Sequence, residues 1–319
     1  MTGWATLNDR AEGAELRFER RLEHAPEKVF RAISDPDELR HWFPAAMEAE
    51  LRPGAPVRFT FEGGDDAPGG EILEVDPPRL LVYSWGDDVL RWEIEPADGG
   101  SRLVFTHTLA PGGASGGLPG TARNAAGWDM CLAALHARLD GDPTPEPAWF
   151  PLFEGYAERF GLGEGRVTAD GVRFERDVVQ TPAEVWALLT GGDASASAGG
   201  LVTASLGIGE PAPRRFGPEP PGRVVAAEPE RALTFAGPAG EVRWTLEPRM
   251  PGALVVVEVA QPDGLPAALA AWQVHLELLV AALAGIERCW PDERVAALEA
   301  RYATRLTAGH FSAAGQAIR

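Results

Sequence analysis

The amino-acid sequence predicts an α+β protein made of two tandem copies of one domain, each a curved antiparallel β-sheet wrapped around a long C-terminal helix. Three observations predict this fold class. Long blocks of sequence recur in the same order, each copy carries several short strand patterns separated by turn residues, and each copy then has a long amphipathic helix. A chain of 319 residues is long for one domain and comfortable for two.

The repeat consists of four blocks that align in the same order. They pair residues 16–34 with 172–190, 71–83 with 223–235, 91–96 with 243–248, and 127–141 with 271–285. A unit of this length is a domain rather than a solenoid repeat. We therefore expect an N-terminal extension over residues 1–14, a first domain over residues 15–162 and a diverged second domain over residues 166–319.

Each copy begins with a predicted strand and a short helix. In the first copy Leu16, Phe18, Arg20 and Leu22 alternate with charged residues, which is typical of a half-buried strand. The segment HAPEKVFRAIS then predicts a helix with proline in its first turn, and a second helical turn, DELRHWF, ends at Pro44.

Strands predominate in the middle of each copy. In the first copy the predicted strands are MEAEL, PVRFTFE, GEILEVD, RLLVYSWG, VLRWEIEP and SRLVFTHTL, and the short turns between them require antiparallel pairing. The predicted helix that follows has apolar residues at helical spacing, starting from Trp128 and, in the second copy, from Trp272. A curved sheet around a helix leaves room for an apolar ligand where side chains do not fill the gap.

Composition excludes several classes of function. The chain has 29 Lys and Arg against 47 Asp and Glu, a net charge of -18, which disfavours nucleic acid and anionic membranes. Two isolated cysteines, Cys131 and Cys289, predict neither a disulfide framework nor a zinc site. The first residues do not have the pattern of a signal peptide, and we expect no membrane span. We expect a cytoplasmic protein without cofactor or metal.

The order of these elements resembles the START-like superfamily, also called SRPBCC or helix-grip. More narrowly, the stretch APEKVFRAISDPDELRHWFP is similar to the bacterial branch named for its likeness to the activator of the Hsp-90 ATPase. The resemblance covers residues 15 to 141 well and residues 171–285 more weakly. It implies two tandem helix-grip domains, and it implies that Trp42 lies near the entrance of a cavity.

Candidate site residues are those expected to face that cavity. They are Trp42, Phe43, Phe59, Phe61, Tyr83, Trp92, Phe105, His107, Trp128, Cys131 and Leu132, with His41 as a gate candidate. A hydrophobic corner would equally explain Trp42 and Phe43, and a hydrogen-bonded core histidine would equally explain His107. No catalytic residue is predicted, because neither His41 nor Cys131 has a visible partner for acid–base or nucleophilic chemistry.

The leading hypothesis is a non-enzymatic protein that holds a small hydrophobic or amphipathic molecule in the first domain. The second domain is expected to be mainly structural, because residues 190–222 offer no acid-capped helix and no aromatic stretch. Two alternatives stay open: a co-chaperone-like module with a protein partner, and an enzyme of the cyclase or dehydratase type. Fold alone does not decide among them.

Overall fold

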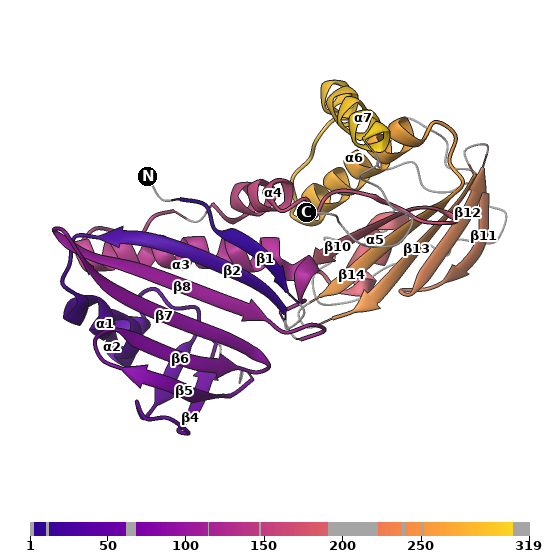
Figure 1. Cartoon of the computed structure of the whole chain (residues 1–319). Helices are drawn as coiled ribbons and strands as arrows, with labels where there is room; N and C mark the ends of the chain where they lie inside the picture. Colours follow the sequence, from indigo (N-terminus) through magenta and orange to yellow (C-terminus); the bar gives the residue numbers. More distant parts are fainter. Residues whose placement is uncertain are drawn as a thin grey trace. The chain divides into compact units, whose positions relative to one another are not determined.

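A computed structural model describes residues 3–10, 13–61, 68–113, 115–146, 148–190, 223–237, 240–249 and 252–308. The chain divides into two units, Met1–Phe160 and Gly161–Arg319, and each is described by itself. Each unit has one antiparallel sheet and helices, so the predicted α+β fold of two tandem helix-grip domains is confirmed (Figure 1).

The sheet of the first unit has the order β1-β2-β8-β7-β6-β5-β4-β3. Its strands are β1 (Thr6–Arg10), β2 (Gly13–Leu22), β3 (Ala46–Ala49), β4 (Pro56–Thr60), β5 (Gly70–Asp76), β6 (Leu80–Trp85), β7 (Asp88–Ala97) and β8 (Gly100–Leu109). Its helices are α1 (Pro26–Ser34), α2 (Pro36–Leu39), the 3-10 turn η1 (Leu118–Gly120), α3 (Thr121–Asp140) and α4 (Trp149–Arg159). The helix α3 runs along one face of the sheet (Figure 1).

The residue pattern explains these elements. Alternate residues of β2 are buried, as the sequence predicts, because one side of the strand faces α3 and the other faces water. The Asp35 carboxylate accepts the Asp37 N–H at 2.9 Å and so caps α2. The buried side of α3 includes Trp128, Leu132 and Leu135, which fall at the predicted helical spacing.

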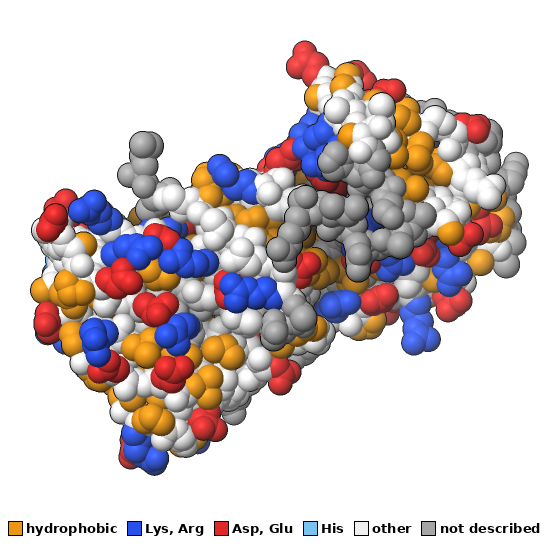
Figure 2. Space-filling view, in the orientation of Figure 1, with side chains coloured by type: hydrophobic (Ala, Val, Ile, Leu, Met, Phe, Trp, Pro, Cys, Tyr) orange, Lys and Arg blue, Asp and Glu red, His pale blue; other side chains and the backbone are white. Residues whose placement is uncertain are grey.

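The opposite face of the first sheet is charged. Arg102 on β8 pairs with Glu19 at 2.6 Å and with Glu95 at 2.7 Å, and Arg91 on β7 pairs with Glu74 at 3.3 Å. Acidic and basic side chains alternate over this face in Figure 2. These exposed cross-strand pairs keep the face solvated, so an apolar ligand is expected on the inner face.

The second unit has the order β9-β10-β14-β13-β12-β11, the same order as β1-β2-β8-β7-β6-β5 in the first. Its elements are β9 (Arg166–Val167), β10 (Gly171–Val178), α5 (Pro182–Thr190), β11 (Arg223–Glu228), β12 (Ala232–Gly237), β13 (Gly240–Pro248), β14 (Ala253–Ala260), α6 (Leu265–Leu283) and α7 (Asp292–Thr307). Counterparts of α2, β3 and β4 would fall in residues 191–222. The prediction that this stretch lacks an aromatic gate therefore lies outside the described residues.

One described helix, α6, is long and apolar enough by length and composition to cross a membrane. Its side chains Leu269, Val274 and Leu276 are fully buried in the core of the second unit. A core helix passes the same test of length and composition, and the packing of α6 explains its apolar character.

A buried polar cluster joins three elements of the first unit. Arg20 of β2 forms an ion pair with Asp129 of α3, and the Tyr156 hydroxyl of α4 donates to the same carboxylate. The Tyr156 oxygen in turn accepts the backbone N–H of Ala5 at 3.0 Å. We call this group the arginine–tyrosine clamp of the first unit.

The second unit repeats the clamp with one change. Arg176 lies on β10, the Tyr302 hydroxyl donates to Gln273 Oε1 at 2.6 Å, and the Tyr302 oxygen accepts the N–H of Gly165 at 2.9 Å. Gln273 therefore takes the place of Asp129. Burial lowers the pKa of Arg176 to about 10, which still leaves it charged at neutral pH.

Residues 3–10, within the expected N-terminal extension over residues 1–14, contact β2 and the clamp. Thr6–Arg10 form β1 and pair with β2 along their whole length, with Thr6 opposite Arg17. Arg20 also donates to the Gly3 carbonyl at 2.9 Å, as Arg176 donates to the Gly163 carbonyl at 2.7 Å. The first residues are part of the fold because they supply backbone partners to a buried arginine.

Candidate functional site

The inner face of the first sheet carries a continuous set of aromatic side chains, which we call the aromatic cluster. Each ring centre lies 3.9 to 6.3 Å from that of a neighbour. The members are Phe18, Trp42, Phe43, Phe59, Phe61, Tyr83, Trp85, Trp92, Phe105 and Trp128. All the aromatic residues predicted to face a cavity thus come together, from β4, β6, β7, β8, α3 and the segment after α2.

The deep end of the aromatic cluster is fully buried. Trp92 and Phe105 stack with ring centres 3.9 Å apart, and Trp128 meets Phe105 edge-on at 4.6 Å. The Trp92 indole N–H donates to the Tyr83 hydroxyl at 3.2 Å, and burial raises the pKa of that hydroxyl. These rings pack against one another and stabilise the contact between sheet and helix.

Trp42 belongs to a packed corner. It is 5% exposed, and its indole N–H donates to the Ala32 carbonyl of α1 at 2.9 Å. Its ring meets Trp92 and Phe43 edge-on. The adjacent His41, predicted as a gate, is exposed. Trp42 therefore holds the segment after α2 against α1, while Phe43 continues toward the other end of the cluster.

The aromatic cluster opens at the other end. Phe59 is fully buried and stacks on Trp85 at 4.4 Å, whereas Trp85 is only partly buried and Phe61 is 41% exposed. We call Phe61 and Trp85 the aromatic rim. Sequence reasoning missed Trp85, although alternation in RLLVYSWG places it on the same face as Tyr83.

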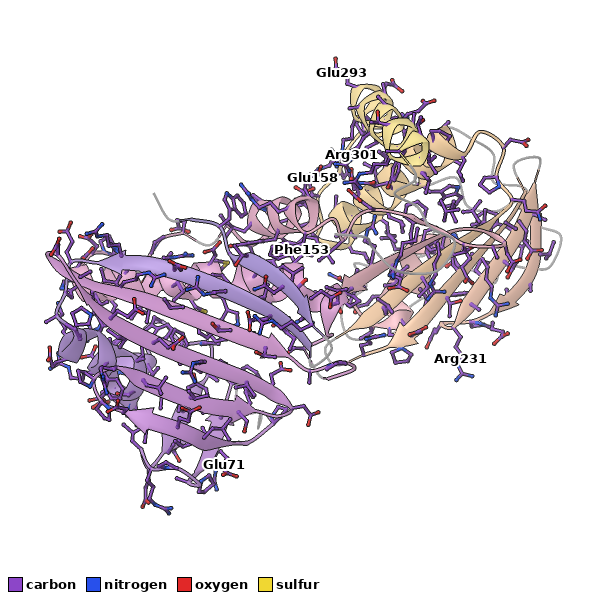
Figure 3. The ribbon with its side chains drawn as sticks, in the orientation of Figure 1. Glu71, Phe153, Glu158, Arg231, Glu293 and Arg301 are labelled. Atoms are coloured by element: carbon purple, nitrogen blue, oxygen red, sulfur yellow. The ribbon has the colours of Figure 1, made fainter. Side chains whose placement is uncertain are left out.

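The start of β5, where Glu71 is labelled in Figure 3, pairs with the end of β6 next to Trp85. There the Glu71 N–H donates to the Ser84 hydroxyl at 3.0 Å. Gly70 permits this close approach, because a Cβ at its position would lie 1.8 Å from the Ser84 carbonyl oxygen. Strands β5 and β6 thus hold the backbone beside Trp85 in one position.

His107 is buried and has partners for both ring nitrogens. The Trp128 indole N–H donates to Nδ1 at 2.9 Å, and Nε2 lies 3.1 Å from the Asp88 carboxylate. Because an indole N–H can only donate, Nδ1 must be the acceptor and Nε2 carries the proton toward Asp88. The structure thus shows a hydrogen-bonded core histidine, with neither nitrogen left for a ligand.

Asp88 is the second residue that the sequence did not single out. It lies at the start of β7, within the turn GDD, where alternation gives no signal. Its second oxygen accepts the Ala110 N–H at 2.8 Å. Burial alone would raise its pKa, but hydrogen bonds from His107, Ser115 and Ala110 hold the pKa of this carboxyl below its ordinary value.

The two remaining candidates lie on α3. Leu132 is buried, and burial raises the pKa of the Cys131 thiol to about 12, so this thiol stays protonated at neutral pH. Within the described ranges, no group of three His, Cys, Asp or Glu side chains is placed to hold a metal ion.

Comparison with known proteins identifies the type of domain. Residues 23–140 match the family model described as "Activator of Hsp90 ATPase homolog 1-like protein". This confirms an AHSA1-like domain of the SRPBCC superfamily in the first unit, and the match covers little more than a third of the chain. Among curated proteins, none matches the chain in sequence.

Solved structures with similar folds each cover about half of this chain. A conserved protein of unknown function from Enterococcus faecalis matches with a TM-score of 0.44 and 17% identity, over 49% of this chain and 90% of its own. CalU16 from Micromonospora echinospora has a TM-score of 0.40 and 21% identity, over 49% and 93%. A protein from Bordetella parapertussis has a TM-score of 0.38 and 23% identity, over 48% and 95%.

Proposed function

We propose that the first unit, with its AHSA1-like domain at residues 23–140, binds a small hydrophobic or amphipathic molecule at the open end of the aromatic cluster. The observation that carries this proposal is the aromatic rim. Most of the cluster is buried to within a few per cent, yet its last ring, Phe61, is 41% exposed. Exposed apolar side chains continuous with a buried aromatic face are typical of a binding site.

Burial of the rim supplies the driving force. Each square ångström of apolar surface removed from water contributes about 25 cal/mol, and an aromatic side chain offers a large surface with few rotatable bonds. The outer face of the sheet instead carries exposed ion pairs such as Arg102–Glu19. The rim is thus the place on this sheet where an apolar molecule gains most.

Binding without catalysis fits the state of His107 and Cys131. A general base needs a free nitrogen within reach of its substrate, and both nitrogens of His107 are engaged by Trp128 and Asp88. Cys131 is held as a neutral thiol. A role as a co-chaperone-like module rests on the description of the matched family alone, and a cytoplasmic location stays a prediction.

Native mass spectrometry of the freshly purified full chain would test the proposal by looking for a co-purified small molecule. A fluorescence titration with phenylnaphthylamine is the second measurement. We expect this probe to bind the natural chain and to bind Phe61→Ser several-fold more weakly.

Leu73→Ser is the matched control, because Leu73 is also 41% exposed but belongs to no ring contact. We expect this variant to bind the probe like the natural chain. Absence of probe binding to the natural chain, or equal losses in the two variants, would overturn the proposal.

A further inference from the structure

We propose that the part of the ligand that reaches the aromatic rim is a flat aromatic ring system, neutral or positively charged, that stacks on Trp85. This inference deepens the proposed function and rests on it. It narrows the ligand from any apolar molecule to one with a planar face and without a negative charge at the rim.

The rings around Trp85 are inclined to its plane at small to moderate angles. The planes of Phe59, Phe43 and Phe61 make angles of 15°, 26° and 34° with the Trp85 plane. At the deep end, by contrast, Trp42 crosses Trp92 at 78°. At the open end three rings are thus stacked on Trp85 or tilted towards it, whereas the deep end combines the stacked pair Trp92 and Phe105 with edge-to-face contacts.

A stack of rings favours another flat ring. Offset stacking brings the electron-rich face of one ring against the electron-poor edge region of the next, and an aliphatic chain offers no such surface. Trp85 remains partly exposed with three rings around it, so an incoming ring can extend the stack. Proteins that hold nucleobases on aromatic platforms use the same interaction.

Trp85 is held by a rigid backbone. Trp85 is the last residue of β6, and Gly86 follows with a φ of 60° in the turn to β7. The Gly86 N–H donates to the Gly69 carbonyl at 2.9 Å, which ties this turn to the end of β5. A platform already fixed by sheet hydrogen bonds loses little conformational entropy when a ring binds.

Negatively charged side chains lie close to Trp85. Trp85 lies directly opposite Asp88 in the register of β6 and β7, and cross-strand partners project from the same face. The Asp88 carboxyl is held in its ionised form by its hydrogen bonds, and Asp87 in the same turn is exposed. The whole chain carries a net charge of -18. A cation over a tryptophan ring is attracted, whereas an anion at this place is repelled.

The test compares three probes on the full chain by isothermal titration calorimetry at physiological ionic strength, which screens long-range attraction. The probes are proflavine, a flat aromatic cation; anthracene carboxylate, a flat aromatic anion; and dodecyltrimethylammonium below its micelle concentration, an aliphatic cation. We expect proflavine to bind about ten-fold more tightly than either of the others.

The variant Phe61→Leu keeps an apolar side chain and removes one ring of the stack. We expect proflavine affinity to fall about three- to ten-fold in Phe61→Leu, with little change for dodecyltrimethylammonium, and no change for either probe in the control Leu73→Ala. Both substitutions are at exposed positions, and circular dichroism would confirm that each variant folds.

The outcomes separate the two proposals. If none of the three probes binds the natural chain, the proposed function fails, and this inference fails with it. If the probes bind but the anion or the aliphatic cation binds as tightly as proflavine, the inference alone is overturned. Binding of proflavine that is unchanged in Phe61→Leu would also overturn it.

Discussion

The two units share a strand order and a clamp, but they differ on their inner faces. In the first unit His107 on β8 lies opposite Leu90, and in the second unit Val259 takes the equivalent place opposite Val242. Where the first unit begins β7 with Asp88, the second begins β13 with Gly240. The second unit thus has Val259 and Gly240 at the positions where the first unit has the buried polar pair His107 and Asp88.

Comparing the two units separates the features that both copies of the fold share from those that occur in the first unit and are replaced in the second. A buried arginine, a helix partner and a tyrosine hydroxyl recur in both units, which indicates that they hold the sheet, the long helix and the closing helix together. The pair His107 and Asp88 occurs in the first unit and is replaced in the second. Features of the first unit that the second has lost are the better candidates for function.

The largest expected loss of stability follows from replacing Trp42 in the packed corner, and the exposed neighbour His41 gives the comparison. Trp42→Ala should lower the free energy of unfolding of the first unit by about 3–5 kcal/mol, because it removes a buried ring and the hydrogen bond to Ala32. His41→Ala, the exposed neighbour, should change it by less than about 0.5 kcal/mol. Urea denaturation followed by hydrogen exchange at peptides of the first unit measures both. A small effect of Trp42→Ala would indicate that Trp42 serves the ligand rather than the corner.

The next largest losses of stability are expected when the clamp of either unit is broken. Asp129→Ala should cost the first unit about 3–5 kcal/mol, because Arg20 is left as an unpaired buried charge. Gln273→Ala should cost the second unit about 1–3 kcal/mol, because a neutral hydrogen bond from Tyr302 is lost. Hydrogen exchange resolved by unit measures the two costs. Equal costs would contradict the view that the direct ion pair of Arg20 with Asp129 makes the first clamp the more costly one to break.

A smaller loss of stability is expected from replacing the first tryptophan of the long helix, and it should differ between α3 and α6. Trp128→Phe keeps the ring but removes the N–H that His107 accepts, and should cost about 1–3 kcal/mol. Trp272→Phe, the equivalent change in the second unit, should cost less, because the position that matches His107 is Val259. Thermal unfolding of both variants, compared with the natural chain, checks the order. The comparison fails if Trp272→Phe is the more damaging change.

The smallest expected effect is a dependence of the stability of the first unit on pH. The folded pKa of Asp88 lies below its ordinary value near 3.9, so its contribution to stability is present above about pH 4 and is lost as pH falls through the folded pKa. Asp88→Asn should remove this contribution at neutral pH, and the stability of the variant should fall less steeply as the pH is lowered. Exchange protection at Ala110, measured in the natural chain and the variant between pH 3 and pH 6, checks the sign.

Alternation allowed much of the cluster to be predicted from the sequence. Period-two patterns place Tyr83, Trp92 and Phe105 on one face of a sheet, and the helical pattern places Trp128 opposite them. Trp85 follows the same alternation and could have been included. The aromatic cluster was therefore accessible to sequence reasoning, including Phe61 at its open end, although the exposure of Phe61 was not.

Contacts between distant segments could not be read from the sequence. Asp88 lies in a turn, where no periodic pattern indicates which way a side chain points, and its partner His107 is on another strand. The pairing of Arg20 with Asp129 joins residues more than a hundred positions apart. The strand β1 was missed because Thr6–Arg10 is polar, and pairing with β2, rather than its own pattern, makes it a strand.

The tyrosine hydroxyls bear on how the two copies arose. Tyr156 binds the backbone of Ala5 and Tyr302 binds that of Gly165, so each closing helix reaches back to the first residues of its own copy. A gene segment copied only from the first recognisable block, near residue 16 or 172, would have produced a repeat without this contact. Each copy therefore includes the residues that lead into its first strand, and the division between the two units lies just after α4. A second copy excised at residue 166 would lose Gly163 and Gly165, whereas one excised at residue 161 would retain them.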